Sequence, residues 1–220
     1  MRELTDVIAL GPFSIYVPHL LSIMAMLLTA LFGMTIVKKH RLLDYKKAFN
    51  LIVDYWIILL VTWKVSYFLY YPEALLQNPL SVIYFNGGEL GIALGVLSVV
   101  VYIYYQHQKH QIKWFNQSLL ALSAVILFCG ISKLIDFIYI PTLLNLLEGL
   151  SYLGLIYFLL ITKSFQTFYT QMSLLRWLLI VWVIFRVFND AIQLYFSWLL
   201  LALIVASVTI VLESIFSRKE

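Results

Sequence analysis

Stretches of roughly 20 mostly apolar residues, separated by short charged segments, constrain the fold of this chain more than any other feature, because about 20 such residues form one membrane-spanning helix. Apolar residues make up 63% of the 220-residue chain and charged residues only 12%, against about 45–50% and 25% in soluble domains. We therefore predict an all-α, polytopic membrane protein with seven transmembrane helices in one domain, residues 1–220. The predicted spans are roughly 12–37, 49–71, 82–105, 114–138, 142–162, 174–195 and 197–216.

This composition excludes several classes of protein. A secreted enzyme, a disordered chain and a nucleic-acid-binding protein do not carry this much apolar sequence, even though the net charge is +4. The first residues contain acids and a Gly-Pro pair, which a cleavable signal peptide would not have. Cys129 is the single cysteine, so no internal disulfide or cysteine-based metal cluster can form. We expect neither a metal nor a cofactor.

Lysine and arginine residues lie almost entirely on one side of the predicted spans. Eleven of the 15 fall on the side of the segment 38–47, and only Arg2 falls on the opposite side. Cytoplasmic segments of membrane proteins carry such an excess of positive charge. The N-terminus is therefore predicted outside the membrane and the C-terminus in the cytoplasm.

Eight charged residues stand out within predicted spans two to six, where a charge costs at least a few kcal/mol and by default indicates a functional site. Asp54 lies near the inner end of its span and is predicted to reach the membrane surface. The other seven come from five spans and share one depth in the outer half of the bilayer. We expect them to meet in an outward-facing polar cavity, with separate structural ion pairs as the alternative. They are Lys64, Glu89, Lys133, Asp136, Glu148, Arg186 and Asp190.

Spacing within two of these helices predicts ion pairs. Lys133 and Asp136 are three residues apart, and Arg186 and Asp190 are four apart. Side chains at these separations are neighbours on a helix surface. Each pair would hold its cation in a defined position.

A glycine-rich segment, Asn86-Gly87-Gly88-Glu89, begins the third predicted span, and Gly91 and Gly95 follow it. Small residues four apart allow two membrane helices to approach closely. Paired glycines also expose backbone N–H groups that can hold an anionic headgroup. A simple turn at the helix entry explains the same pattern, so both interpretations stay open.

The four histidines divide into two groups. His40, His107 and His110 are predicted to be solvated loop residues on the cytoplasmic side. His19 follows Pro18 in the outer third of the first span. It is the one imidazole at the depth of the charged layer, so it is either a packed core residue or a base.

Six short motifs follow one another along the chain. They are Gly11-Pro12-Phe13-Ser14-Ile15, Lys64-Val65-Ser66-Tyr67, Asn86-Gly87-Gly88-Glu89-Leu90-Gly91, Ser132-Lys133-Leu134-Ile135-Asp136-Phe137, the segment from Pro141 to Glu148, and Trp182 followed by Arg186 and Asp190. In this order they resemble the Gly-Pro-x-x-Ile, Arg-x-x-Tyr, His-Gly-Gly-x-x-Gly, Gly-Arg-Ile-Gly-Asn-Phe, Pro-Ser-Gln-Leu-Tyr-Glu and Tyr-Gly-x-x-Arg-Phe-x-x-Glu motifs of the prolipoprotein diacylglyceryl transferases.

The resemblance implies a function in the bacterial cytoplasmic membrane. These seven-span enzymes transfer diacylglyceryl from phosphatidylglycerol to the lipobox cysteine of a preprolipoprotein. The implied partners are phosphatidylglycerol or another glycerophospholipid, and a lipoprotein signal-peptide helix. The implied catalytic residues are Arg186, Lys133, Glu89 and His19. The implied substrate-binding residues are Asn86, Gly87, Gly88, Lys64, Asp136, Glu148, Trp182 and Asp190.

The chain departs from the family pattern at positions that matter for this chemistry. Asn86 stands in place of the motif histidine and cannot accept a thiol proton. Lys64 and Lys133 replace arginines, so a point charge replaces a bidentate phosphate contact. Asp136 replaces an asparagine, and Trp182 replaces a tyrosine.

Three functions therefore remain open. The first is a diverged diacylglyceryl transferase. The second is a catalytically inactive relative that binds lipid or a signal helix, or acts as a partner subunit. The third is a small-solute transporter, which is less favoured because transporter sites lie near the bilayer midplane.

Overall fold

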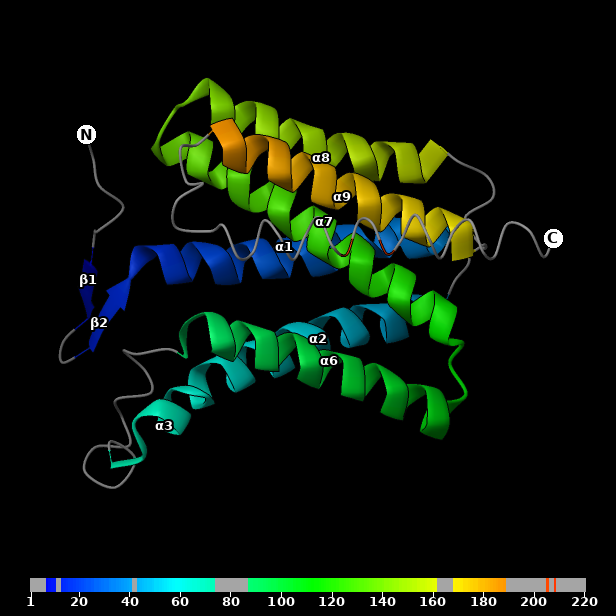
Figure 1. The fold of residues 1–220 in the computed structure, drawn as a ribbon, viewed down its shortest axis with the longest axis horizontal. Coiled ribbons are helices and arrows are strands. Elements are labelled where there is room, and N and C mark those ends of the chain that lie inside the picture. The colour runs from blue at the N-terminus through cyan, green and yellow to red at the C-terminus, as the bar shows by residue number, and fades with distance from the viewer. Residues whose placement is uncertain are drawn as a thin grey trace. The chain divides into compact units, whose positions relative to one another are not determined.

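A computed structural model describes residues 7–10, 13–40, 43–73, 87–161 and 168–188, together with residues 205 and 208 (Figure 1). Six helices in these ranges are long and apolar enough to cross a membrane. The prediction of a helical, multi-pass membrane protein is therefore confirmed. The seventh predicted span, 197–216, lies outside the described residues except at positions 205 and 208.

The chain divides into two compact units. Unit 1 comprises residues 1–41 and 122–220, and unit 2 comprises residues 42–121. Each unit holds part of the predicted site.

The first described element of unit 1 is a β-hairpin and not a helix. Strands β1 (Val7–Leu10) and β2 (Phe13–Tyr16) pair antiparallel, with Ile8 opposite Ile15. Helix α1 (Val17–His40) follows, so the predicted start of the first span near residue 12 is wrong. β-branched and aromatic residues favour the strand. Pro18 is accepted in the first turn of α1, where a backbone N–H has no partner within the helix.

The remaining helices of unit 1 are α7 (Trp114–Tyr139, in this unit from residue 122), α8 (Leu143–Ile161) and α9 (Phe168–Phe188). The ends of α7 and α8 agree with the prediction to within one residue. Helix α9 begins at Phe168, before the predicted start at 174, and Arg176 lies within it. Lys163 and the other polar residues before α9 had suggested a later start.

A short turn joins α7 to α8, and we call this end of unit 1, residues 139–143, the junction end. The Thr142 hydroxyl oxygen accepts a hydrogen bond of 3.3 Å from the Asn145 backbone N–H, which caps the start of α8. The Asn145 side-chain amide donates to the Ile140 carbonyl at 3.3 Å. Further along, a Cβ added at Gly149 would lie 3.2 Å from the Gly130 carbonyl oxygen. The two glycines therefore let α7 and α8 approach each other closely.

Unit 2 is built on the pairing of α2 (Tyr45–Val65) with α6 (Gly88–His110), and the short helix α3 (Tyr67–Tyr70) follows α2. Gly87, Gly91 and Gly95 face α2. A Cβ at Gly91 would clash with the Ser66 hydroxyl oxygen, and one at Gly95 would lie 3.1 Å from the Leu59 carbonyl oxygen. The glycine pattern thus produces the close helix approach that the sequence predicts.

The histidines predicted to lie in loops do not lie there. His107 and His110 are in the last turn of α6, which continues to residue 110 and ends at Gln111 with φ 52°. A ring nitrogen of His107, Nδ1, lies 2.8 Å from the Ile112 carbonyl oxygen. His40 is the last residue of α1, and its Nε2 lies 3.1 Å from the Leu159 carbonyl oxygen of α8. The rings of His40 and His107 thus contact backbone carbonyls at the ends of their helices.

A substitution at Gly91 tests the packing of α2 against α6. We expect Gly91→Ala to lower the free energy of unfolding by about 1–3 kcal/mol, because an added methyl group overpacks a filled contact. Thermal unfolding in detergent, followed by tryptophan fluorescence, measures this change. Gly154→Ala on α8 is the matched control, since nothing lies within 4 Å of a Cβ there. Equal melting temperatures for the two variants would contradict this packing.

Candidate functional site

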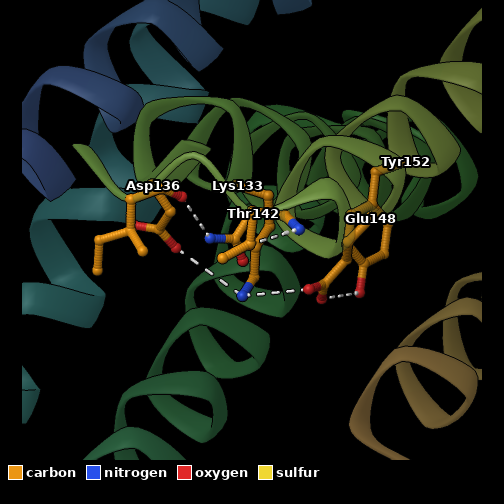
Figure 2. Close-up of polar contacts among 7 residues, drawn as sticks. Lys133, Asp136, Thr142, Glu148 and Tyr152 are labelled. Atoms are coloured by element: carbon orange, nitrogen blue, oxygen red, sulfur yellow. Dashed lines mark hydrogen bonds and ion pairs between the residues drawn. The ribbon is translucent and has the colours of Figure 1, made fainter. Parts of the chain in front are cut away.

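An ion-pair cluster lies near the junction end of unit 1, centred on Lys133 of α7 (Figure 2). Its Nζ lies 3.1 Å from Oε2 of Glu148 on α8 and 3.8 Å from Oδ2 of Asp136 on α7. The Tyr152 hydroxyl donates a hydrogen bond of 3.5 Å to Oε1 of Glu148. The structure thus brings together three of the seven charged residues that the sequence places at one depth.

Helix length explains why Lys133 and Glu148 meet. Lys133 lies six residues before the end of α7, and Glu148 lies five residues after the start of α8. At about 1.5 Å per residue, both lie roughly 8–9 Å from the turn. A short turn between antiparallel helices therefore sets the two side chains level with each other.

The two carboxylates differ in burial. The Glu148 side chain is 5% exposed, the Lys133 side chain 24% and the Asp136 side chain 41%. A buried carboxylate is strongly destabilising unless a cation neutralises it. The Lys133–Glu148 pair is therefore the structural core of the cluster. Asp136, at 3.8 Å, is too far for a hydrogen bond to Lys133 and interacts with it through charge alone.

A second cation reaches the same part of unit 1 from α9. The Arg186 guanidinium carbon lies 5.6 Å from the centroid of the Trp182 ring, which is a cation–π contact. Arg186 also lies near Tyr152 of α8 and Cys129 of α7. Asp190, the predicted ion-pair partner of Arg186, lies outside the described residues.

His19 belongs to the same unit. It is half-buried in the first turn of α1. The start of α1 lies at the same end of unit 1 as the junction of α7 with α8 (Figure 1).

The other predicted site residues belong to unit 2. Lys64 is in the last turn of α2, with Nζ 5.4 Å from the centroid of the Trp63 ring. Glu89 is exposed in the first turn of α6. Asn86 lies outside the described residues.

The two paired glycines, Gly87 and Gly88, form the turn that begins α6 and bind it to Trp63 of α2. The Gly87 N–H donates to the Trp63 carbonyl at 3.0 Å, and the Trp63 indole N–H donates to the Gly88 carbonyl at 3.2 Å. Gly88 has φ +58°, a conformation that favours glycine. Because the Gly87 N–H is hydrogen-bonded to the Trp63 carbonyl of α2, it is not available to a headgroup. The helix-entry interpretation of this motif is therefore favoured over headgroup binding.

Sequence reasoning missed a polar network in unit 2. The Tyr102 hydroxyl donates to Oδ2 of Asp54 at 2.6 Å and accepts a hydrogen bond from the Gln106 amide. Nearby, the Tyr55 hydroxyl donates to Oε1 of Gln117 at 3.4 Å. Asp54 is therefore held by a tyrosine of α6. The four-residue spacing of Tyr102 and Gln106 was the only available signal.

Metal binding finds no support in the described ranges, where no group of three or more His, Cys, Asp and Glu side chains is arranged to hold an ion. The charged residues described near the junction end are two cations, Lys133 and Arg186, and two carboxylates, Asp136 and Glu148. No protein-family model, curated protein or solved structure matches this chain. Its function must therefore be inferred from its own residues.

A double-mutant cycle tests the Lys133–Glu148 pair. We expect Lys133→Met to lower the free energy of unfolding by about 3–5 kcal/mol, because it leaves Glu148 buried without a counterion. The double variant Lys133→Met/Glu148→Met should recover most of this loss, and Asp136→Asn should change stability by less than about 1 kcal/mol. Denaturant unfolding in detergent measures all three. Additive losses in the double variant would show that the two side chains do not interact.

Proposed function

We propose that this protein binds a glycerophospholipid near the junction end of unit 1, with the lipid phosphate between Lys133 and Arg186. The observation that carries the proposal is the buried Lys133–Glu148 ion pair, which fixes a partly exposed cation at membrane depth. Ionisable groups at such a depth are retained for binding or catalysis far more often than for stability.

The surroundings of the cluster support a ligand that is polar at one end and apolar at the other. Ile138 is 76% exposed and Leu143 is 70% exposed, and both flank the turn between α7 and α8. Lys133 and Asp136 precede Ile138 on α7, and Glu148 follows Leu143 on α8, so the charged residues and the exposed apolar ones belong to the same helix ends. In a phospholipid, the phosphate can contact such cations and the acyl chains can pack against such apolar surfaces. A small polar solute has no acyl chains to pack there.

The class of reaction comes from the motif resemblance. In the transferase form of the proposal, a lipoprotein cysteine thiol attacks the glyceryl carbon that carries the phosphate. The C–S bond forms, the C–O bond breaks, and its electron pair leaves with the phosphorylated headgroup, which Lys133 and Arg186 stabilise. The thiol proton passes to a base, for which His19, in the first turn of α1 at the junction end of unit 1, is the candidate. The protein then lies in the bacterial cytoplasmic membrane with the junction end outside.

One observation favours a second candidate, binding without transfer. The Gly87 N–H is taken by the Trp63 carbonyl, and Lys133 already faces two carboxylates. With Asn86 in place of the motif histidine, these features support an inactive relative. Such a protein would bind lipid or a lipoprotein signal helix, or serve as a partner subunit of an active transferase.

Lipid binding by two arginine variants tests the proposed phosphate contact. We expect Arg186→Ala to weaken retention of a phospholipid by about tenfold or more, the factor for losing one charge-assisted hydrogen bond. Native mass spectrometry of the purified protein, titrated with phospholipid, measures this. Arg176→Ala, on the same helix, is the matched control and should retain lipid as the wild type does. Equal loss in both variants, or none in Arg186→Ala, would contradict the assignment.

Complementation separates transfer from binding alone. The gene is expressed in a strain depleted of its own diacylglyceryl transferase, and prolipoprotein is followed by mass spectrometry. A diacylglyceryl mass shift that disappears in Arg186→Ala establishes the transferase. Lipid binding without a mass shift, at good expression, establishes the second candidate.

A further inference from the structure

Asp136 is the one member of the ion-pair cluster that the cluster itself does not require. Its side chain is the most exposed of the three and lies 3.8 Å from Lys133. Glu148, by contrast, is buried, lies closer to Lys133 and is hydrogen-bonded by Tyr152. Lys133 is therefore neutralised without Asp136.

The Asp136 carboxylate also has hydrogen-bond acceptor positions that no described residue fills. Within the described ranges, its side chain accepts no hydrogen bond, and its interaction with Lys133 is longer than a hydrogen bond. An ionised carboxylate offers about four acceptor positions. A carboxylate at membrane depth with open acceptor positions favours a ligand that carries hydrogen-bond donors.

The charges of the cluster also indicate which net charge the headgroup should carry. Among the residues that the structure describes near the junction end, Lys133 and Arg186 supply two positive charges and Asp136 and Glu148 supply two negative ones, so these four are neutral together when ionised. An anionic headgroup would add an uncompensated charge in a medium of low dielectric constant, which is costly. A headgroup with one negative and one positive charge preserves the balance.

We propose that the site selects a zwitterionic glycerophospholipid with a primary ammonium, such as phosphatidylethanolamine. The phosphate contacts Lys133 and Arg186, and the ammonium donates hydrogen bonds to Asp136. This inference rests on the proposed lipid-binding function and names its substrate class. The ethylene bridge of the headgroup keeps phosphate and ammonium adjacent, as Lys133 and Asp136 are adjacent on α7.

Other headgroups satisfy the site less well. A choline headgroup has the same charges but no N–H donors for Asp136. A glycerol headgroup has hydroxyl donors but leaves a net negative charge. A serine headgroup adds a carboxylate that Asp136 and Glu148 repel.

Competition among lipids in the full-length protein tests the proposal. The purified protein is mixed with equal amounts of phosphatidylethanolamine, phosphatidylglycerol and phosphatidylcholine of the same acyl chains, and bound lipid is measured by native mass spectrometry. We expect phosphatidylethanolamine to be retained most. Asp136→Asn should lower the ratio of bound phosphatidylethanolamine to phosphatidylglycerol by about tenfold, the factor for one charge-assisted hydrogen bond. Asp136→Glu should preserve the preference.

Asp54→Asn is the matched control. Asp54 is also a carboxylate within a span, but it belongs to unit 2 and is held by Tyr102. The ratio should not change in this variant. If the wild type prefers phosphatidylglycerol, or if Asp136→Asn leaves the ratio unchanged, the headgroup assignment is overturned while lipid binding stands. If the wild type retains no phospholipid, the proposed function fails together with it.

Discussion

The ion pair between Lys133 and Glu148 is the interaction on which the junction end of unit 1 depends. A carboxylate that is 5% exposed between apolar helices requires a cation, and only a fixed register of α7 against α8 supplies it at 3.1 Å. The Thr142 cap and the close approach of Gly130 to Gly149 hold the same register. Packing and charge therefore constrain each other, and a shift of either helix would disrupt both.

Glycine contacts perform the same task in both units. Lipid tails are as apolar as leucine, so helices in a bilayer associate mainly through close packing of small residues. In unit 2, Gly91 and Gly95 bring α6 against α2. The Gly87 N–H is likewise bonded to α2, through the Trp63 carbonyl, although the motif of Gly87 resembles one from a lipid-modifying enzyme. This is why the proposed ligand contacts lie on Lys133, Asp136 and Arg186 and not on the glycine pair.

Hydropathy, together with proline and polar residues between the spans, predicted some element boundaries well and others poorly. Pro141 marks the turn between α7 and α8, and both helix ends agree with the prediction to within one residue. Residues 13–16 are as apolar as a helix start, yet they form a strand because they pair with residues 7–10. The polar segment before Gln111 continues α6, since a polar helix end can remain helical beyond the apolar core.

Apolar length along the chain is enough to identify a multi-pass membrane protein and most of its spans, because both depend only on position along the sequence. Which charges meet depends on the rotation of each helix and on its neighbours, and hydropathy carries no information about either. The pairing of Glu148 with Lys133, of Asp54 with Tyr102 and of His40 with the Leu159 carbonyl therefore follows only from the packed helices.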